Sequence, residues 1–448
     1  MTDKRFYGKV ARIAIPVALQ GLVSSSLTLL DNMMVSSLSE TALSAVNLGV
    51  QLFNIQWMMI FGFCTGCSTF LTQLWGAKDR DNIKKVMGFA LVNTTVLSFI
   101  FFCLGTFFPL KVMSIYTSDP VAAELGAQYL RTASVNFLFI GIINPLSTSL
   151  RSTEQTRIPM YISLAAFVTD VVFNYCLIFG NFGFPRLEIR GAALATVIAR
   201  ALEFCLMICM VFVRKNPLRG LTAGMFRFDK AFAKRIYKNS IFTTLNETLW
   251  SGANSAMSAA YSRIGTLQYA AYSASITVMN LFLMCMFSIG DASLILVGAK
   301  IGEGRPDEAK DTARRLLRMA AVFGTAAGAL IALFAGTIIK IFDLSPEGFA
   351  LARKVMYVNA AFCPLYLVNG VLISGTLRAG GDTRFAAITE ILIMWLTSVP
   401  LSFIGALWLK LPIHLVVLMV QFEGIIKFFF LFRRFRSGKW LHYMIEDL

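Results

Sequence analysis

Residues 88–110 read GFALVNTTVLSFIFFCLGTFFPL, a run of 23 residues without one charged side chain. The hydrocarbon core of a bilayer is about 30 Å thick and takes about 20 such residues as an α-helix. The apolar runs are continuous rather than alternating, which favours helices over a membrane β-barrel. Working outward from this run, the sequence predicts twelve membrane-spanning helices, at residues 10–35, 43–68, 88–112, 127–152, 157–180, 191–213, 238–260, 270–294, 314–337, 350–377, 384–408 and 411–432.

The composition supports a membrane protein rather than a soluble one. Of the 448 residues, 56% are hydrophobic and 15% are charged, and the mean hydropathy is +0.67. A soluble domain carries about 25% charged residues. The net charge of +16 comes from basic residues in short segments between apolar runs, so we expect no nucleic-acid partner. The first run is long and lacks a small-residue cleavage site, which predicts a span rather than a signal peptide.

Basic residues are unequally divided between the two predicted sides of the membrane. Of the 41 Lys and Arg residues, 31 fall on the side of the N-terminus and nine on the opposite side, while Arg200 lies within a span. Cytoplasmic loops of membrane proteins carry the excess of Lys and Arg. We therefore expect a multi-pass protein of the cell inner membrane with both termini in the cytoplasm.

Short motifs recur in the two halves of the chain. Gly76-Ala77-Lys78 follows the second span and Gly298-Ala299-Lys300 follows the eighth, an offset of 222 residues. Leu150-Arg151 and Leu377-Arg378, each separated by four residues from a following Thr-Arg, are offset by 227 residues. Parallel repeats of this kind are typical of transporters, in which the halves enclose a cavity.

The predicted fold is therefore an all-α integral membrane protein with two pseudo-symmetric six-helix bundles. Its expected parts are an N-terminal lobe at 1–213, a cytoplasmic linker at 214–237, a C-terminal lobe at 238–432 and a cytoplasmic tail at 433–448. Within the spans, Gly62-x-x-x-Gly66 and Gly324-x-x-x-Gly328 predict close helix packing.

Several sequence features limit the chemistry of the protein. A GxxxxGK[ST] phosphate loop is absent from the sequence, so transport would draw on an ion gradient rather than on a nucleotide. The chain has two histidines, His414 and His442, and one CxxC pair, Cys64 and Cys67, within a predicted span. We expect neither an enzyme, nor a cofactor, nor a metal site.

Carboxylates in spans are the first candidates for function, since a charged side chain at the centre of a membrane helix costs about 2.5–3.5 kcal/mol. Asp31 lies in the first span, and Asp170 and Asn174 lie four residues apart on one face of the fifth. We predict that Asp31, Asp170 and Asn174 form the cation-coupling site. The alternative is that Asp31 reaches the interface and that Asp170 is satisfied by neighbouring helices.

A second group of candidates lies in the C-terminal half. Asn246 and Glu247 lie in the seventh span, and Trp250 and Tyr272 could bind a lipophilic cation through their rings. We predict that these four residues bind substrate, with structural packing as the alternative.

Other charged residues within spans are weaker candidates. Arg200 and Glu203 are three residues apart, which predicts a structural ion pair. Weaker candidates for a functional role are Asp291, Glu390 and Glu423. Glu390 could instead stay hydrated near the inner end of its span.

The sequence resembles the bacterial multidrug and toxic compound extrusion (MATE) transporters along essentially its whole length. The matching stretches are Pro16 to Asp31, Gln73 to Lys78, Asn174 to Gly180, Gly191 to Arg200, Val297 to Gly304 and Leu377 to Arg384. The resemblance implies antiport of drugs against Na⁺ or H⁺, with Asp31 as the coupling carboxylate and Glu247 as a span-7 carboxylate of one branch. This chain departs from the family in two places: the Asp and Asn of span 5 are swapped, and Asn369 stands in a stretch where that branch has Asp.

The predicted function is a secondary antiporter, acting as a monomer in contact with membrane lipid, that exports organic, cationic, lipophilic compounds in exchange for H⁺ or Na⁺. The alternative is a flippase for a lipid-linked oligosaccharide precursor, which would need a basic cavity. Lys and Arg are scarce within the predicted spans, which disfavours the flippase. A passive channel is a third possibility, against which the two-lobed repeat argues.

Overall fold

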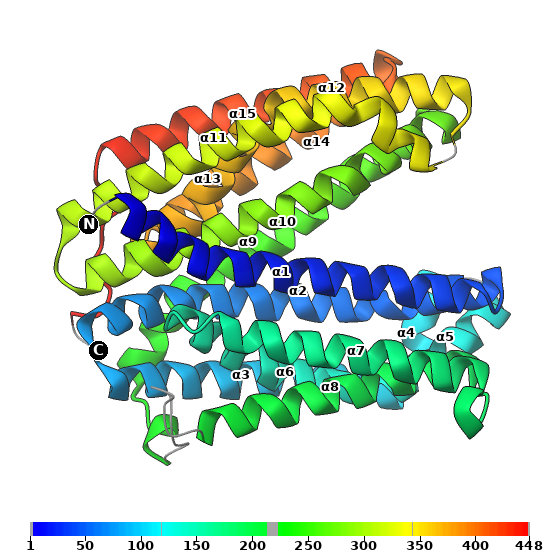
Figure 1. Cartoon of the computed structure of the whole chain (residues 1–448), viewed down its shortest axis with the longest axis horizontal. Coiled ribbons are helices and arrows are strands. Elements are labelled where there is room, and N and C mark those ends of the chain that lie inside the picture. The colour runs from blue at the N-terminus through cyan, green and yellow to red at the C-terminus, as the bar shows by residue number, and fades with distance from the viewer. Residues whose placement is uncertain (1–2, 118, 213–222, 343, 447–448) are drawn as a thin grey trace. The chain divides into compact units, whose positions relative to one another are not determined.

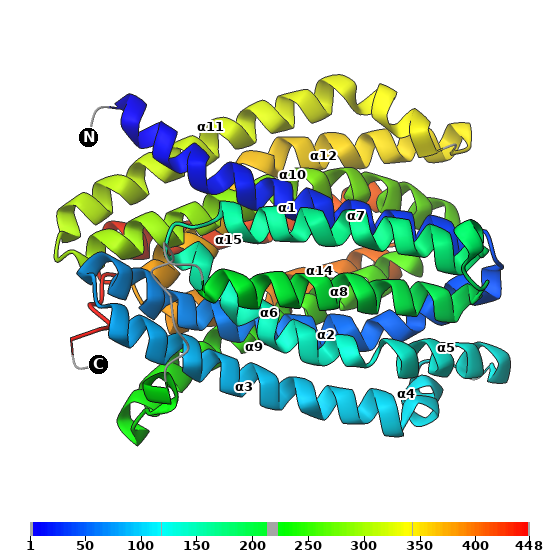
Figure 2. The same cartoon turned by 60° about the horizontal axis from the view of Figure 1, so that its bottom comes forward.

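The computed structural model describes residues 3–117, 119–212, 223–342 and 344–446, and within these ranges the regular elements are all helical. Figures 1 and 2 show the long helices from two directions. The helices of the first half are α1 (Asp3–Ser36), α2 (Glu40–Ala77), α3 (Arg80–Phe107), α4 (Pro109–Tyr116), α5 (Pro120–Ala133), α6 (Val135–Ser152), α7 (Arg157–Phe179) and α8 (Glu188–Phe212).

The second half repeats this pattern of long helices. It comprises α9 (Lys230–Ser262), α10 (Thr266–Gly302), α11 (Pro306–Ile339), α12 (Pro346–Gly370), α13 (Thr383–Ile393), α14 (Val399–Phe403) and α15 (Ile413–Arg436). Three π-helical segments, η4 (Val371–Leu377), η5 (Met394–Ser398) and η6 (Ile404–Trp408), continue α12, α13 and α14 without a break.

Nine helices within the described ranges are long and apolar enough to cross a membrane. A tenth span is formed by α5 and α6, which meet at a 49° bend. The remaining two predicted spans, 238–260 and 270–294, fall within the long helices α9 and α10, which have 33 and 37 residues. The predicted all-α fold with twelve transmembrane helices is thus confirmed.

The third helix ends earlier than predicted. The apolar run suggested a span at 88–112, but α3 stops at Phe107 and α4 begins at Pro109. Proline lacks the backbone N–H needed to continue a helix, and it is well tolerated in the first turn of a new one. The apolar pattern alone does not separate these two helices.

The chain packs as two compact units, which do not follow the sequence halves everywhere. One, here called the N-terminal unit, contains Ile15–Leu71 and Lys78–Ser240. The other, the C-terminal unit, contains Met1–Ala14, Thr72–Ala77 and Ile241–Leu448. The first turns of α1 belong to the C-terminal unit because Phe6, Val10 and Ile13 are buried in its apolar core. The expected lobes placed both short segments with the first half.

The predicted linker is only partly described. Residues 214–222 of the segment 214–237 lie outside the described residues, and from Lys230 onward the chain already forms α9. The N-terminal part of that helix therefore precedes the predicted start of the seventh span.

Within the N-terminal unit, α3 packs against α6, and α7 packs against α8. Local signals set the helix ends: the Asp79 carboxylate accepts a hydrogen bond from the backbone N–H of Asn82 at the start of α3. Gly180, with φ of +78°, ends α7 in a left-handed conformation that suits glycine.

Within the C-terminal unit, α11 packs closely against α12. A Cβ atom at Gly324 would lie 2.6 Å from Cα of Pro364, and one at Gly328 would overlap the backbone carbonyl of Ala360. The Gly324-x-x-x-Gly328 motif therefore acts in packing within the chain.

The glycines of the two repeated Gly-Ala-Lys motifs, Gly76 and Gly298, both lie at close helix contacts inside the C-terminal unit. A Cβ atom at Gly76 would overlap the carbonyl oxygen of Ala299, and one at Gly298 would overlap the hydroxyl of Thr72. The end of α2 and the end of α10 can approach this closely only because both positions lack a side chain.

The segment after α15 is packed onto the C-terminal unit. Trp440 is fully buried and stacks against Phe435. The side-chain amide of Gln73 donates to the carbonyl of His442, and its oxygen accepts from the backbone N–H of Met444. The predicted tail at 433–448 thus includes the end of α15 and a segment with a buried tryptophan.

Candidate functional site

Two buried carboxylates share one amide group in the N-terminal unit. Nδ2 of Asn174 donates to Oδ1 of Asp31 and to Oδ2 of Asp170, and each distance is 2.8 Å. A primary amide carries two N–H groups, so one nitrogen can serve both acids. Asp170 and Asn174 are buried and Asp31 is half-buried. The structure therefore brings together the three residues that the sequence proposed for cation coupling.

A second polar network, on α1, α7 and α8, pairs an acid with a cation. Nη1 of Arg200 lies 2.6 Å from Oε2 of Glu203, which is the ion pair predicted from their spacing. The hydroxyl of Ser163 donates to Oε1 of Glu203, and Nε2 of Gln20 donates to that hydroxyl. This network leaves Glu203 with a cation and two hydrogen-bonded oxygens.

Unlike Glu203, the two acids Asp31 and Asp170 are not paired with a cation within the described ranges. Among the described residues, neither acid forms an ion pair, and Oδ1 of Asp170 and Oδ1 of Asn174 have no hydrogen-bond partner. Two carboxylates this close repel one another when both are ionised. The arrangement suits the binding of a proton or a small cation, which would remove the repulsion and use the open oxygens.

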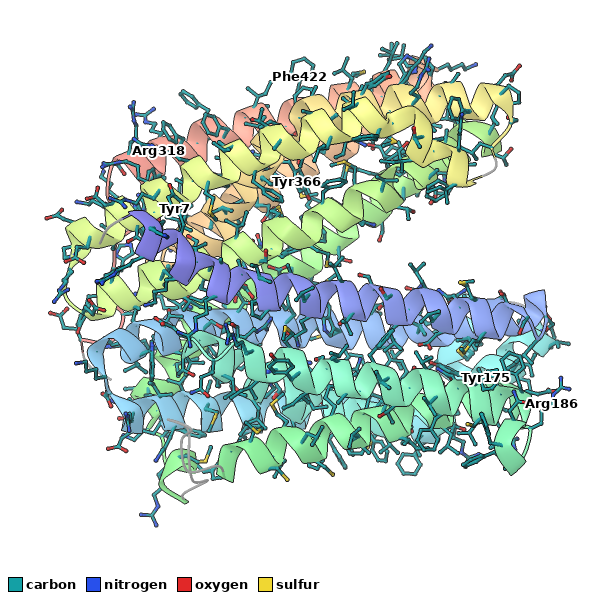
Figure 3. The ribbon with its side chains drawn as sticks, viewed as in Figure 1. Tyr7, Tyr175, Arg186, Arg318, Tyr366 and Phe422 are labelled. Atoms are coloured by element: carbon teal, nitrogen blue, oxygen red, sulfur yellow. The ribbon has the colours of Figure 1, made fainter. Side chains whose placement is uncertain are left out.

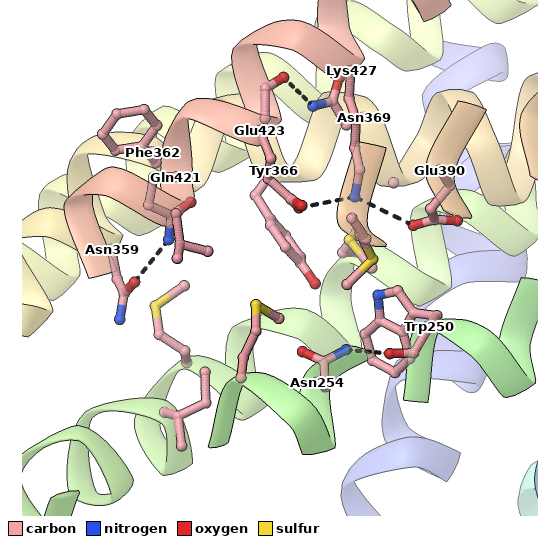
Figure 4. Close-up of a pocket in the computed structure, with 18 of the residues that line it drawn as sticks. Trp250, Asn254, Asn359, Phe362, Tyr366, Asn369, Glu390, Gln421, Glu423 and Lys427 are labelled. Carbon is pink, nitrogen blue, oxygen red and sulfur yellow. Dashed lines mark hydrogen bonds and ion pairs between the residues drawn. The ribbon is translucent and has the colours of Figure 1, made fainter. Parts of the chain in front are cut away.

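The C-terminal unit holds a cavity of about 400 Å³ between α9, α10, α12, α13 and α15. Figure 4 shows its wall. Asn246, Glu247, Trp250 and Tyr272, which the sequence grouped as substrate-binding residues, all line this cavity. Its volume is within the range of small-molecule sites.

An ion pair crosses one side of the cavity. Nη2 of Arg378 donates to Oε1 of Glu247 at 2.6 Å, and both side chains are buried. Arg378 directly follows the predicted span 350–377, and its side chain is buried in the wall of the cavity. The π-helical segment η4 carries the span on to Leu377. Because a π-turn bonds residue i to i+5 and contains an extra residue, it turns the following side chain to another face.

A second charged group lies beside the first. Nζ of Lys427 is 2.9 Å from Oε1 of Glu423 and 3.8 Å from Oε1 of Glu390. Oε2 of Glu390 also accepts from Nδ2 of Asn246 at 2.9 Å, and the hydroxyl of Ser398 donates to Glu423. Glu390 is buried rather than hydrated, contrary to one expectation.

Lys427 was not foreseen because it was grouped with the basic residues at the cytoplasmic end of the predicted span 411–432. The signal was nevertheless present: Glu423 and Lys427 are four residues apart, the spacing at which opposite charges pair on a helix. The pairing with Glu390 on α13 depends on tertiary packing and has no local signal.

Aromatic side chains form much of the remaining wall. The rings of Tyr261 and Tyr272 meet edge to face with centroids 4.7 Å apart, and Tyr269 lies next to Tyr272. Figure 3 shows Tyr366 between the helices of the C-terminal unit and Phe422 on the outside of α15. Phe422 is exposed, as expected for a lipid-facing side chain.

The fold and the two sites define a polytopic helical membrane protein with repeated halves, one unit holding a carboxylate cluster and the other a charged aromatic cavity. The MatE family model matches residues 16–176 and, again, residues 240–404. The chain therefore belongs to the MatE family, whose members are membrane transporters, and the predicted resemblance is confirmed. The double match also agrees with the repeat found in the sequence.

Curated relatives and solved structures agree with this assignment. The chain is 26% identical over 402 residues to the probable multidrug resistance protein YoeA of Bacillus subtilis (strain 168), covering 89% of this chain and 87% of the relative. It is 23% identical over 439 residues to the probable multidrug resistance protein NorM of Thermotoga maritima, covering 96% and 92%.

Among solved structures, an outward-facing multidrug resistance MATE family transporter of the MOP superfamily has the same fold. Its TM-score is 0.87 at 18% identity, with 96% of each chain covered. A MOP superfamily transporter from Pyrococcus furiosus, described as having a binding pocket of reverse polarity, matches with a TM-score of 0.86 at 18% identity and the same coverage.

Proposed function

We propose that this MatE family protein is a secondary antiporter that exports organic cations in exchange for H⁺ or Na⁺. The observation that carries the proposal is the pair of acids, Asp31 and Asp170, held on the single amide of Asn174. Acids in a membrane helix are costly, and those that persist commonly mark ion pathways. The names of the multidrug resistance relatives support drug export as the other half of the exchange.

The exchange follows from differential affinity. A proton or Na⁺ bound at Asp31 and Asp170 removes negative charge from the N-terminal unit, and this stabilises one conformation over another. A ligand shifts such an equilibrium only by the difference in its affinity for the two states. Transport is coupled when the ion and the organic compound favour opposite states of the protein.

The cavity in the C-terminal unit is the proposed substrate site. It contains three acids, Glu247, Glu390 and Glu423, against two cations, Arg378 and Lys427, so its formal charge is negative by one unit. Tyrosine and tryptophan rings attract a cation over their faces. Both features favour a monovalent, amphiphilic cation.

The cavity also bears on the alternative of a lipid-linked oligosaccharide flippase. Such a substrate carries a pyrophosphate and needs unpaired basic groups. Arg378 and Lys427 are basic residues in the cavity, but each already contacts a glutamate. The charge balance therefore favours the cation exporter.

Location and orientation belong to the same proposal. The excess of Lys and Arg on one side supports a multi-pass protein of the cell inner membrane, acting as a monomer among lipids, with both termini in the cytoplasm. Labelling of single cysteines introduced at Lys439 and Arg186, in intact cells with a membrane-impermeant maleimide, tests this orientation. Labelling at position 439 but not at 186 would contradict it.

The decisive experiment uses the full chain in everted vesicles with ethidium as a fluorescent cation. The proton gradient and the Na⁺ gradient are collapsed in separate experiments. Dye accumulation should stop in only one of them, and that gradient identifies the coupling ion. Asp31→Asn should reduce accumulation at least tenfold at unchanged protein level, while Glu124→Gln, an exposed acid of the same unit, should not. Wild-type accumulation by Asp31→Asn, or insensitivity to both gradients, would overturn the proposal.

A further inference from the structure

Lys427 places a positive charge inside the wall of the cavity. Its side chain is only 7% exposed, and its ammonium lies between Glu423, on its own helix, and Glu390, on α13. Figure 4 shows this group facing the space lined by Trp250 and Asn254. A cation of alkylammonium type is therefore already bound where the cavity is most acidic.

The two contacts of this ammonium are unequal. Its 2.9 Å contact with Glu423 is reinforced by the four-residue helical spacing, whereas the contact with Glu390 is longer, at 3.8 Å. Glu423 also accepts from Ser398. Lys427 can therefore leave Glu390 and remain paired with Glu423.

Glu390 is prepared to bind another cation when Lys427 leaves. Its second oxygen accepts from Asn246, which holds the carboxylate toward the cavity. Oδ1 of Asn246 and Oδ1 of Asn369 have no hydrogen-bond partner among the described residues, and both residues line the cavity. Buried oxygens of this kind can accept from the N–H groups of a ligand or from the displaced lysine.

We propose that Lys427 is a tethered competitor, which occupies Glu390 until the positive group of a transported compound displaces it. Lysine suits this role because its compact ammonium sits on a flexible stem. The proposal rests on the proposed function and adds a specificity-determining residue to it. An incoming monovalent cation restores the pairing of Glu390, so the charge of the site is satisfied both with and without substrate.

The competitor also discriminates among cations. A strongly hydrated ion such as Na⁺ must lose its water and displace the lysine, whereas an amphiphilic cation gains apolar contacts with the tyrosine rings. The lysine therefore excludes alkali ions from Glu390 and leaves ion coupling to the N-terminal unit. Without Lys427, Glu390 would bind both kinds of cation.

The test measures binding of tetraphenylphosphonium to the purified full-length protein in detergent by isothermal titration calorimetry. Lys427→Met alone leaves both Glu390 and Glu423 without a cation, so the variant of choice is Glu423→Gln/Lys427→Met, which keeps the net charge of the cavity. It should bind tetraphenylphosphonium at least tenfold more tightly than the wild type. It should also bind Na⁺ in calorimetry at the C-terminal unit, measured in an Asp31→Asn background, where the wild-type cavity does not.

Lys427→Arg provides a variant that keeps the charge. The planar guanidinium can bind both acids at once and is displaced less easily. We expect weaker tetraphenylphosphonium binding than in the wild type, and unchanged binding in Lys340→Met, which alters an exposed lysine of the same unit. Equal or weaker binding by the double variant, or tighter binding by Lys427→Arg, would overturn the role of the lysine.

The outcomes separate this inference from the proposed function. If vesicles export ethidium under an ion gradient but the double variant gains no affinity, only the role of Lys427 fails. If the double variant binds tetraphenylphosphonium more tightly than the wild type but vesicles export no ethidium under either gradient, the competition by Lys427 stands and the exporter fails.

Discussion

Nη2 of Arg378 lies 2.6 Å from Oε1 of Glu247, which joins two buried side chains 131 positions apart in the sequence. The contact neutralises an acid that otherwise would be unpaired in the wall of the cavity. Removing one partner of a buried ion pair is costly because the other charge stays behind.

Arg378→Met should therefore lower the free energy of unfolding by about 3–5 kcal/mol. Glu247→Gln in the same chain should recover most of that loss, since no unpaired charge remains. Thermal unfolding in detergent provides the measurement. Arg314→Ala, which breaks an exposed pair with Asp311, should change stability by less than about 1 kcal/mol. If Arg378→Met and Arg314→Ala lowered the free energy of unfolding equally, the buried pair would have no structural role.

Asn174→Leu should impair both stability and coupling. The variant removes the donor shared by Asp31 and Asp170, and each hydrogen bond to a charged group contributes about 1.5–3 kcal/mol. We expect transport to fall at least tenfold at a given ion gradient, because the two acids lose their common orientation. Gradient-driven uptake in proteoliposomes measures this loss. Normal uptake would show that the amide does not organise the site.

Gly76→Ala should destabilise the C-terminal unit by about 1–3 kcal/mol, the usual range for overpacking. The added methyl group would overlap the carbonyl of Ala299 and push α2 away from α10. Gly336→Ala is the matched control, because a Cβ atom there meets nothing within 4 Å. Both variants can be compared by thermal unfolding. A Gly76→Ala protein as stable as Gly336→Ala would rule out the close approach.

Trp440→Ala should cost about 3–5 kcal/mol, as expected for a fully buried aromatic side chain. The variant also leaves the carbonyl of Phe435 without its indole donor. Tyr443→Ala, at an exposed position of the same segment, should cost less than about 1 kcal/mol. Limited proteolysis after residue 436 and thermal unfolding both report the difference. Similar behaviour of the two variants would mean that the segment does not contribute to the fold.

The positions of the helices could be predicted because apolar runs of the required length are a local property of the chain. The break at Pro109 and the packed segment around Trp440 were missed, since one depends on a single residue within an apolar run and the other on tertiary contacts. The assignment of the first turns of α1 to the C-terminal unit likewise depends on distant partners.

The candidate sites were predictable to different extents. Asp31, Asp170 and Asn174 stand out because polar residues are rare and costly at membrane depth, and four-residue spacing places two of them on one face. The partners of Glu247 and Glu390 were not foreseen, because Arg378 and Lys427 lie beyond the predicted centres of their spans. A π-helical segment before Arg378 changes the direction of its side chain, and periodicity cannot anticipate that change.

The contact between the two Gly-Ala-Lys motifs has a practical consequence for building hybrid transporters. Gly76 comes from the first half of the chain and Gly298 from the second, and each faces a backbone or hydroxyl group of the other half. A chimera that joins one half of this protein to a half of a relative must therefore supply a residue without a side chain at both positions. A donor half with a bulkier residue there would force the two helices apart and destabilise the hybrid, however well its remaining sequence matched.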